Sequence, residues 1–257
     1  MQREQVTPAL VLRTRPYGES DRIVTLLTEQ HGKLNGIAKG AKNSRRRFAG
    51  TLEPFVHVRA VFRQRPGTDL VFLVRCELLG VLRRFTQDLD LFAAGSYVLE
   101  LTDRMVLGRE SGHDVYRLVH DALTLLDGGA ACDPLLRAFE LHLLAASGYA
   151  PALDRCRGCG CVAEATALYL AVERGGLVCR SCAVPNEPLR PVATRTARAL
   201  VGLAARPLAS VSTDVERETL RDAAAVLEQL LAGVTAGPLR TRAFLARARV
   251  DSSNGVR

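Results

Sequence analysis

The chain has 257 residues, of which 47% are hydrophobic and 24% charged, and this balance excludes collagen-like and disordered classes of protein. Its N-terminal residues lack an apolar run of signal-peptide length, and no stretch approaches the ~20 apolar residues of a membrane-spanning helix, so a cytoplasmic protein is predicted. The net charge of +8 and the isoelectric point near 9.4 favour an anionic partner, most often nucleic acid.

Residues 1–82 have the period-2 alternation of β-strands, interrupted by Gly- and Pro-containing turns. One face of the fourth predicted strand carries Val56, Val58, Ala60 and Phe62, and one face of the fifth carries Phe72, Val74 and Cys76. Five short strands within this length predict a small closed barrel. The predicted strands cover residues 9–15, 23–28, 33–38, 55–65 and 70–78.

A strongly basic segment follows the third predicted strand. Residues 39–47 contain five cations and include Gly40, which is typical of a flexible loop that follows a phosphate backbone without reading bases. A solvated loop or a nuclear localisation signal remains the alternative, and Phe48 is either a base-stacking or a core residue. The predicted nucleic-acid contacts are Arg13, Arg15, Lys33, Lys39, Lys42, Arg45, Arg46, Arg47, Arg59 and Arg63.

From residue 83 the apolar residues follow the period of a helix. The first helix is expected to bury Leu89, Phe92 and Ala93. A later helix is expected at 134–147. A second should begin with Thr194 as its N-cap, and a third should begin with the capping box Thr213-x-x-Glu216. We therefore predict an α+β protein. Its parts are a barrel domain at 1–82, a helical domain at 83–250 that includes a metal-binding hairpin at 154–185, and a flexible tail at 251–257.

Five of the seven cysteines lie between Cys156 and Cys182. Cys156-Arg-Gly-Cys159 and Cys179-Arg-Ser-Cys182 are two C-x-x-C pairs separated by 19 residues, which is the spacing of a zinc ribbon. Four thiolates close a tetrahedron around one ion and leave no position for a reactive water, so one structural Zn²⁺ is predicted. Cys161 is interpreted as a spectator.

Motifs for catalysis are absent from the sequence: there is no phosphate-binding loop, dinucleotide fingerprint, nucleophile elbow or H-E-x-x-H. The five histidines are not spaced with a carboxylate or thiol in a recognisable catalytic set, and structural roles are predicted for them. No catalytic residue is assigned. The sequence leaves two alternatives open, an RNA-binding factor that combines a barrel with a zinc ribbon, and an enzyme that uses the Cys161 thiol.

Three stretches carry a resemblance to a known family. They are the opening from ALVLRTRPYGESDRIVTLL to KGAKNSRRRFAGTLEPF, the two strands that follow it up to Glu77-Leu-Leu, and GYAPALDRCRGCG at 148–160. Together they resemble the RecO family of bacterial recombination mediator proteins, over roughly residues 9–245. The opening block and the run around the first cysteine pair are specific, whereas the late helices are not.

The resemblance implies an N-terminal OB-fold followed by one helical domain that carries the zinc hairpin. It also implies a non-enzymatic protein that binds single- and double-stranded DNA and anneals complementary strands. Such a protein works with RecR and with single-stranded DNA-binding protein (SSB), helps to load RecA, and is cytoplasmic, associating with the nucleoid during repair. The SSB C-terminal tail would meet the helical domain. The cations available in its first part are Arg104, Arg109, Arg117 and Arg137.

Overall fold

The structure is a computed structural model of the chain. It describes residues 3–64, 67–108, 113–162, 167–235, 237–245 and 247. The chain divides into two compact units: unit 1 comprises Met1–Gly129 together with Leu239–Arg257, and unit 2 comprises Ala130–Pro238. The division between units does not follow the change from strands to helices at residue 83, because the first two long helices group with the barrel.

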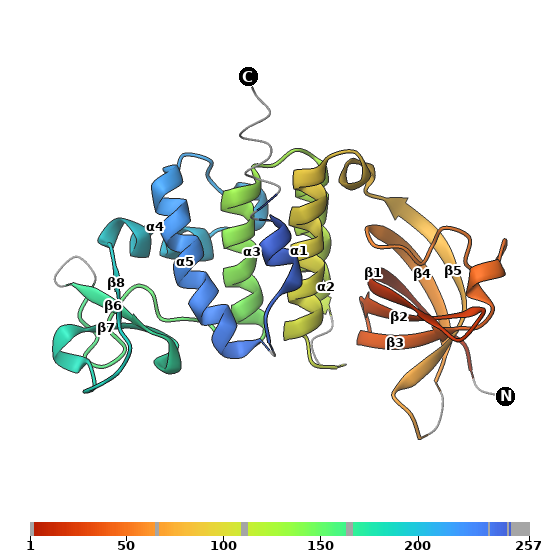
Figure 1. The fold of residues 1–257 in the computed structure, drawn as a ribbon, viewed down its shortest axis with the longest axis horizontal. Helices are drawn as coiled ribbons and strands as arrows, with labels where there is room; N and C mark the ends of the chain where they lie inside the picture. Colours follow the sequence, from red (N-terminus) through yellow and green to blue (C-terminus); the bar gives the residue numbers. More distant parts are fainter. Residues whose placement is uncertain are drawn as a thin grey trace. The chain divides into compact units, whose positions relative to one another are not determined.

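Unit 1 begins with a closed five-stranded barrel (red to orange in Figure 1). The strand order is β1-β2-β3-β5-β4, and β3 and β5 form the parallel pair. This closed order is that of an OB-fold, and it confirms the barrel predicted from the alternating pattern. The strands are β1 (Gln5–Tyr17), β2 (Asp21–Thr28), β3 (Gly32–Ala38), β4 (Val56–Arg63) and β5 (Leu70–Val81).

The barrel core confirms one predicted strand face and corrects another. Val56, Val58, Ala60 and Phe62 of β4 are all buried, as the pattern indicated. In β5 the expected inward positions of Phe72 and Val74 are wrong, because Val71, Leu73 and Cys76 are the buried residues. The β4–β5 register shifts between Val61 and Phe62. Such a bulge leaves one residue unpaired and moves every later side chain to the opposite face.

Phe48 lies in the same core and is only 3% exposed, so the core interpretation of this residue is correct and the stacking one is wrong. The loop that carries it contains a short 3-10 turn, η1 (Ala41–Asn43). The basic segment is therefore anchored to the barrel at its C-terminal end rather than hanging free.

The helices of unit 1 are η2 (Arg83–Thr86), α1 (Leu89–Met105) and α2 (His113–Asp127). Asp88 caps α1 by accepting a 3.0 Å hydrogen bond from the backbone N–H of Leu91. The expected apolar face of α1 is correct for Ala93, which is buried, but wrong for Leu89 and Phe92, which are exposed. The helix buries Leu91 and Ala94 in their place. Residues 240–245 return to unit 1 as a helical turn.

The described residues of unit 2 form three α-helices and a small sheet. The sheet has the order β7-β6-β8, with antiparallel pairs throughout. Helix α4 begins at Thr194 with Ala193 as its N-cap, and α5 begins at Arg217. The two predicted N-caps are therefore wrong by one and by several residues. The elements are α3 (Cys132–Ala146), β6 (Leu168–Ala171), η3 (Val172–Arg174), β7 (Gly176–Cys179), η4 (Arg180–Cys182), β8 (Arg190–Val192), α4 (Thr194–Ala204), η5 (Leu208–Ser210) and α5 (Arg217–Val234).

The end of α3 follows the sequence signal closely. The helix stops at Ala146, and Gly148 adopts a left-handed conformation with φ of 83°, as expected for a glycine that terminates a helix. Across the part of the chain that the structure describes, no helix is both long enough and apolar enough to span a bilayer.

Candidate metal centre and nucleic-acid interface

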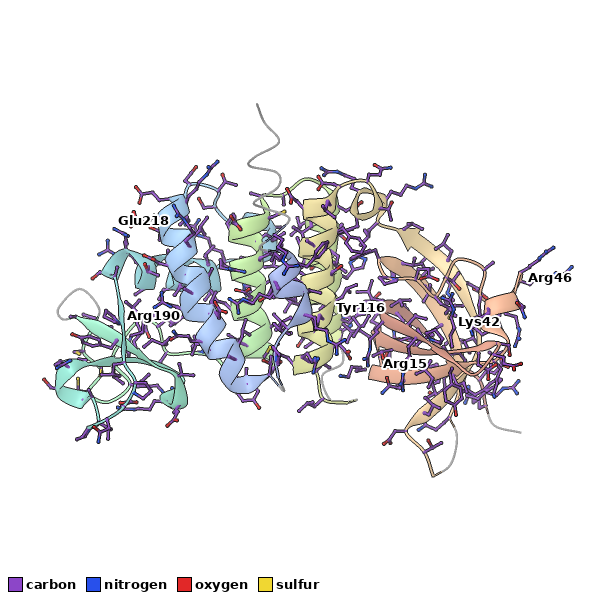
Figure 2. All side chains as sticks on the ribbon, in the orientation of Figure 1. Arg15, Lys42, Arg46, Tyr116, Arg190 and Glu218 are labelled. Atoms are coloured by element: carbon purple, nitrogen blue, oxygen red, sulfur yellow. The ribbon has the colours of Figure 1, made fainter. Side chains whose placement is uncertain are left out.

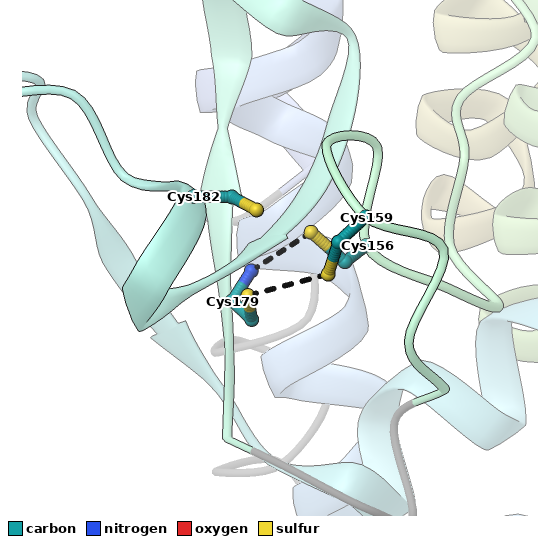
Figure 3. A group of neighbouring side chains, drawn as sticks. All are labelled: Cys156, Cys159, Cys179 and Cys182. Carbon is teal, nitrogen blue, oxygen red and sulfur yellow. Dashed lines mark hydrogen bonds between the residues drawn. The ribbon is translucent and has the colours of Figure 1, made fainter.

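Four cysteines of unit 2 converge on one point (Figure 3). Cys156 and Cys159 come from a tight turn before β6, whereas Cys179 ends β7 and Cys182 ends η4. Their sulfur atoms all lie within 4.8 Å of one another. The strands β6 and β7 form the hairpin that joins the two pairs, as the sequence predicted.

The distances between the sulfur atoms fit a shared metal ion. The Sγ atoms of Cys159 and Cys179 are 3.7 Å apart, far longer than the ~2.05 Å of a disulfide bond. Four sulfurs at about 2.3 Å from a central ion would be about 3.8 Å from one another in a regular tetrahedron. The four-cysteine cluster is therefore consistent with a metal site, and all seven cysteines are free of disulfides.

Backbone N–H groups around Cys156 favour the thiolate form that a metal needs. The N–H groups of Gly158 and Cys179 point at its sulfur from 3.3 and 3.2 Å. Burial raises the pKa of the Cys156 thiol, but hydrogen bonds from the backbone of Cys159, Cys179 and Gly158 outweigh that effect and bring it to about 6. A thiol in this setting gives up its proton readily.

Two glycines shape this centre, and sequence reasoning missed both. A Cβ at Gly158 would lie 2.7 Å from the Cβ and Sγ of Cys182, and a Cβ at Gly176 would lie 2.5 Å from the carbonyl oxygen of Ala152. Both positions therefore require glycine. Gly160, the glycine that the sequence did single out, adopts a φ of 75°, as the turn after the second cysteine requires.

Cys161 lies beside the four-cysteine cluster but is not one of its members. Its carbonyl oxygen accepts a 2.7 Å hydrogen bond from the N–H of Cys156. The residue thus supports the turn through its backbone, and its side chain is not needed to complete a tetrahedron.

In unit 1 the basic segment 39–47 is held in place by hydrogen bonds and one ion pair. Lys39 forms a 2.7 Å ion pair with Asp21 at the start of β2. Donation from Lys39 and from the N–H of Gly40 holds the pKa of the Asp21 carboxyl below its ordinary value. Lys42 donates to the carbonyl oxygens of Gly18 and Glu19 at 3.1 and 2.7 Å. Both lysines are therefore partly engaged with the barrel.

Arg45 and Arg46 lie at the outer end of this segment and are exposed. Neither forms an ion pair with any residue that the structure describes, and Figure 2 shows Arg46 projecting away from the barrel. Arg47 instead donates to the carbonyl oxygen of Lys39 at 2.9 Å and lies over the ring of Phe48. Two free guanidinium groups thus mark the tip of the loop.

The cations on the barrel strands differ in how far they are neutralised. Arg15 is exposed on β1 and has no ion pair among the described residues. Arg59 pairs with Glu77 at 3.4 Å, and Arg63 pairs with Glu4 at 2.6 Å. Arg13 and Lys33 share Asp103 of α1, with N–O distances of 3.4 and 3.3 Å.

Lys33 is the most enclosed of the predicted contacts. Its side chain is only 14% exposed, and its Nζ donates to the carbonyl oxygen of Asp103 at 2.6 Å. An ammonium group held in this way is not available to a phosphate at the surface. The sequence could not show this, because the partner lies 70 positions further along the chain.

The cations suggested as contacts for an SSB tail also differ in how far they are exposed. Arg137 of α3 is 6% exposed and is ion-paired with Glu140. It therefore cannot serve as a surface contact. Arg109 lies outside the described residues.

Comparison with known proteins covers almost the whole chain. Residues 1–82 match the family Recombination protein O N terminal, and residues 86–243 match Recombination protein O C terminal. A DNA repair protein RecO from Anaeromyxobacter sp. (strain Fw109-5) is 38% identical over 92% of this chain and 93% of the relative. One from Geobacter sulfurreducens is 37% identical over 92% and 95%, and one from Myxococcus xanthus is 40% identical over 68% and 71%.

The two family matches follow the change from barrel to helices, and the second includes all four clustered cysteines. The Anaeromyxobacter and Geobacter relatives align over nearly their full length, so the barrel, the helices and the hairpin are compared as one protein. This chain therefore belongs to the RecO family of DNA repair and recombination proteins.

Proposed function

We propose that this protein is a non-enzymatic recombination mediator that binds single- and double-stranded DNA and anneals complementary strands. With RecR it would help to load RecA on SSB-coated DNA during repair. The family membership across the whole chain is the observation that carries this proposal. The free arginines Arg15, Arg45 and Arg46 on the OB-fold barrel support it with a surface suited to phosphates.

The barrel contacts DNA mainly through the phosphate backbone. A guanidinium group can donate two hydrogen bonds to the oxygens of one phosphate, and contacts with phosphates carry no information about the base. Arg15, Arg45, Arg46 and Arg47 are the principal contacts, whereas Lys39, Lys42, Arg59 and Arg63 contribute after exchanging their present partners. Arg13 also contributes to the DNA contacts, because its side chain is exposed. Lys33 is not included among the contacts, because its side chain is enclosed. Neutralised phosphates repel a second strand less, which speeds pairing of complementary bases.

The four cysteines Cys156, Cys159, Cys179 and Cys182 hold one structural Zn²⁺ in this proposal. Zinc, when bound, cross-links two turns that are too small to have a core of their own. No residue is given a catalytic role. The metal would act on DNA only by keeping unit 2 folded.

The partners that we propose besides DNA are RecR and the C-terminal tail of SSB, with RecA as an indirect partner. A tether to SSB raises the local concentration of the barrel beside the strand that SSB covers. Annealing would then proceed without hydrolysis of a nucleotide.

The test is annealing of complementary single strands coated with cognate SSB, measured by energy transfer between dyes and without ATP. The wild-type protein should accelerate annealing. The double variant Arg45→Glu/Arg46→Glu should lose most of this effect, whereas Arg221→Glu, an exposed arginine of α5, should keep it. Unchanged annealing with and without the wild-type protein would refute the proposal.

The second candidate is an RNA-binding factor that combines the OB-fold with the metal hairpin, and the same basic loop favours it. A 2′-hydroxyl preference separates the two candidates. Tighter binding of an RNA 20-mer than of the DNA 20-mer of the same sequence, at equal salt, would favour the RNA-binding protein.

A further inference from the structure

A depression in unit 1 lies between β1, α1 and the helical residues 240–245. It has a volume of about 340 Å³, within the ~300–1,000 Å³ typical of ligand pockets in proteins. Leu12, Pro54 and Leu99 supply an apolar lining. Arg13, Arg104 and Arg240 line the same depression, from segments that are far apart in the sequence.

One acidic residue of the depression is already neutralised from the barrel side. Asp103 binds the guanidinium of Arg13 at 3.4 Å and the ammonium of Lys33 at 3.3 Å. Two cations therefore share one carboxylate. This part of the lining keeps a positive balance, and Arg13 remains 60% exposed in spite of the ion pair.

The other acidic residue is engaged by the C-terminal segment. Glu100 accepts hydrogen bonds from the backbone N–H of Arg240 at 3.0 Å, and from the N–H and hydroxyl of Thr241 at 2.7 and 2.6 Å. Its carboxylate oxygens are thus occupied by donors that are not the Arg240 side chain. That side chain is exposed and makes no ion pair with any of the described residues.

The depression continues the surface on which the proposed DNA contacts lie. Arg13 and Arg15 are two residues apart on β1 and share its outward face, about 7 Å from each other along the strand. Arg15 is exposed and is one of the free barrel arginines. A single DNA strand that follows the barrel along β1 would therefore reach the depression.

We propose that this depression binds one nucleotide of a single DNA strand. Arg13 and Arg240 donate to the phosphate oxygens on either side of the nucleotide, and its sugar and base rest on Leu12, Pro54 and Leu99. The inference rests on the proposed DNA-binding function and adds the C-terminal segment to the interface. The described lining contains no aromatic residue, so the base packs on aliphatic side chains rather than stacking on a ring.

Two variants test the two halves of the site. Arg240→Gln removes a phosphate contact but keeps the backbone N–H that Glu100 binds. Ser96→Phe fills the depression from α1 without changing any charge. Arg221→Gln on α5 is the matched control, because it removes an equally exposed arginine from unit 2.

Binding of a fluorescent oligo(dT) 20-mer is measured by anisotropy between 50 and 300 mM salt. Arg240→Gln should make the logarithmic salt slope shallower by about 0.7 and weaken binding about fivefold at 0.1 M salt. Ser96→Phe should weaken binding with the slope unchanged. Arg221→Gln should match the wild-type protein in both quantities.

The outcomes separate this inference from the proposed function. If the wild-type protein does not bind the oligonucleotide, the DNA-binding function itself fails. If it binds, and Arg240→Gln leaves both affinity and slope at the wild-type values, the nucleotide site is refuted while the barrel interface stands. Arg240→Gln decides this point even if Ser96→Phe does not fold, because it changes an exposed side chain only.

Discussion

Glu100 of α1 caps the C-terminal helical turn by accepting hydrogen bonds from both the N–H and the hydroxyl of Thr241, at 2.7 and 2.6 Å. A helix start normally finds its cap in the residue just before it. Here the cap comes from a helix 141 positions earlier in the chain. The contact ties the last described segment to the unit that contains the barrel.

Replacement of Glu100 by Ala should release this segment. The expected loss is about 1 kcal/mol of unfolding free energy, the usual cost of a lost helix N-cap. Urea denaturation measures this loss, and limited proteolysis should show faster cleavage near residue 240. Glu19→Ala is the matched control, because Glu19 is exposed and only its backbone carbonyl is engaged. Equal stability of the two variants would show that the cap contributes nothing.

Gly158→Ala should disrupt the metal centre. The new Cβ would meet the Cβ and Sγ of Cys182 at 2.7 Å, so one cysteine must leave its position. Metal content per chain, measured by mass spectrometry of the native protein, should fall well below one. Gly202→Ala on α4 is the control, because nothing lies within 4 Å of its Cβ and alanine favours a helix by ~0.5–1 kcal/mol. Full metal content in Gly158→Ala would contradict this prediction.

Substitution of single cysteines should distinguish ligands from neighbours. Cys159→Ser should lose the metal, because its sulfur is 3.7 Å from that of Cys179 and completes the cluster. Cys161→Ser should retain it, because Cys161 is not one of the four clustered cysteines and its backbone carbonyl, which supports the turn, is unchanged by the substitution. Metal content and thermal unfolding of both variants test this. If Cys161→Ser lost the metal and Cys159→Ser kept it, Cys161 would be the ligand and Cys159 the neighbour.

Acidic pH should destabilise unit 1 through His57. Partial burial and the neighbouring His120 hold the pKa of His57 below its ordinary value of about 6.5, while Glu29 opposes the shift. The folded chain therefore binds fewer protons at His57 than the unfolded chain does just below pH 6.5. Its contribution to stability is complete above that pH and is lost as the pH falls through the lower, folded pKa.

The measurement is thermal unfolding of the wild-type protein and of His57→Gln from pH 7.5 to 5.0. Nε2 of His57 and the hydroxyl of Tyr116 are hydrogen-bonded at 2.6 Å, and a glutamine amide, which has both a donor and an acceptor, can keep this hydrogen bond. Burial, together with Glu29, raises the pKa of Tyr116 to about 12, so the hydroxyl does not titrate in the range tested. The variant should lose less stability on acidification. Parallel curves would assign the pH dependence to other groups.

The sequence predicted what depends on short-range spacing. The five strands, the glycine that ends α3 and the two C-x-x-C pairs each follow from residues within a few positions of one another. The metal centre is the strongest case, because the gap within each pair already defines the turn that brings two sulfurs together.

What the sequence did not predict depends on contacts between distant segments. The need for glycine at 158 arises from Cys182, and the enclosure of Lys33 arises from Asp103. The buried face of β5 differs from the predicted one because of a bulge that the local sequence pattern does not indicate. The buried face of α1 was ambiguous because that helix is apolar on several sides and is packed from more than one direction.

Because unit 1 is closed by residues 239–245, unit 2 is in effect an insertion within it. On the ribosome the barrel and α1 emerge before unit 2, yet the donors that satisfy Glu100 are synthesised only after it. Unit 2 can therefore complete its own packing while unit 1 still lacks a part. A change to residues 239–245 would therefore act on the barrel unit, although unit 2 separates these residues from the barrel in the sequence.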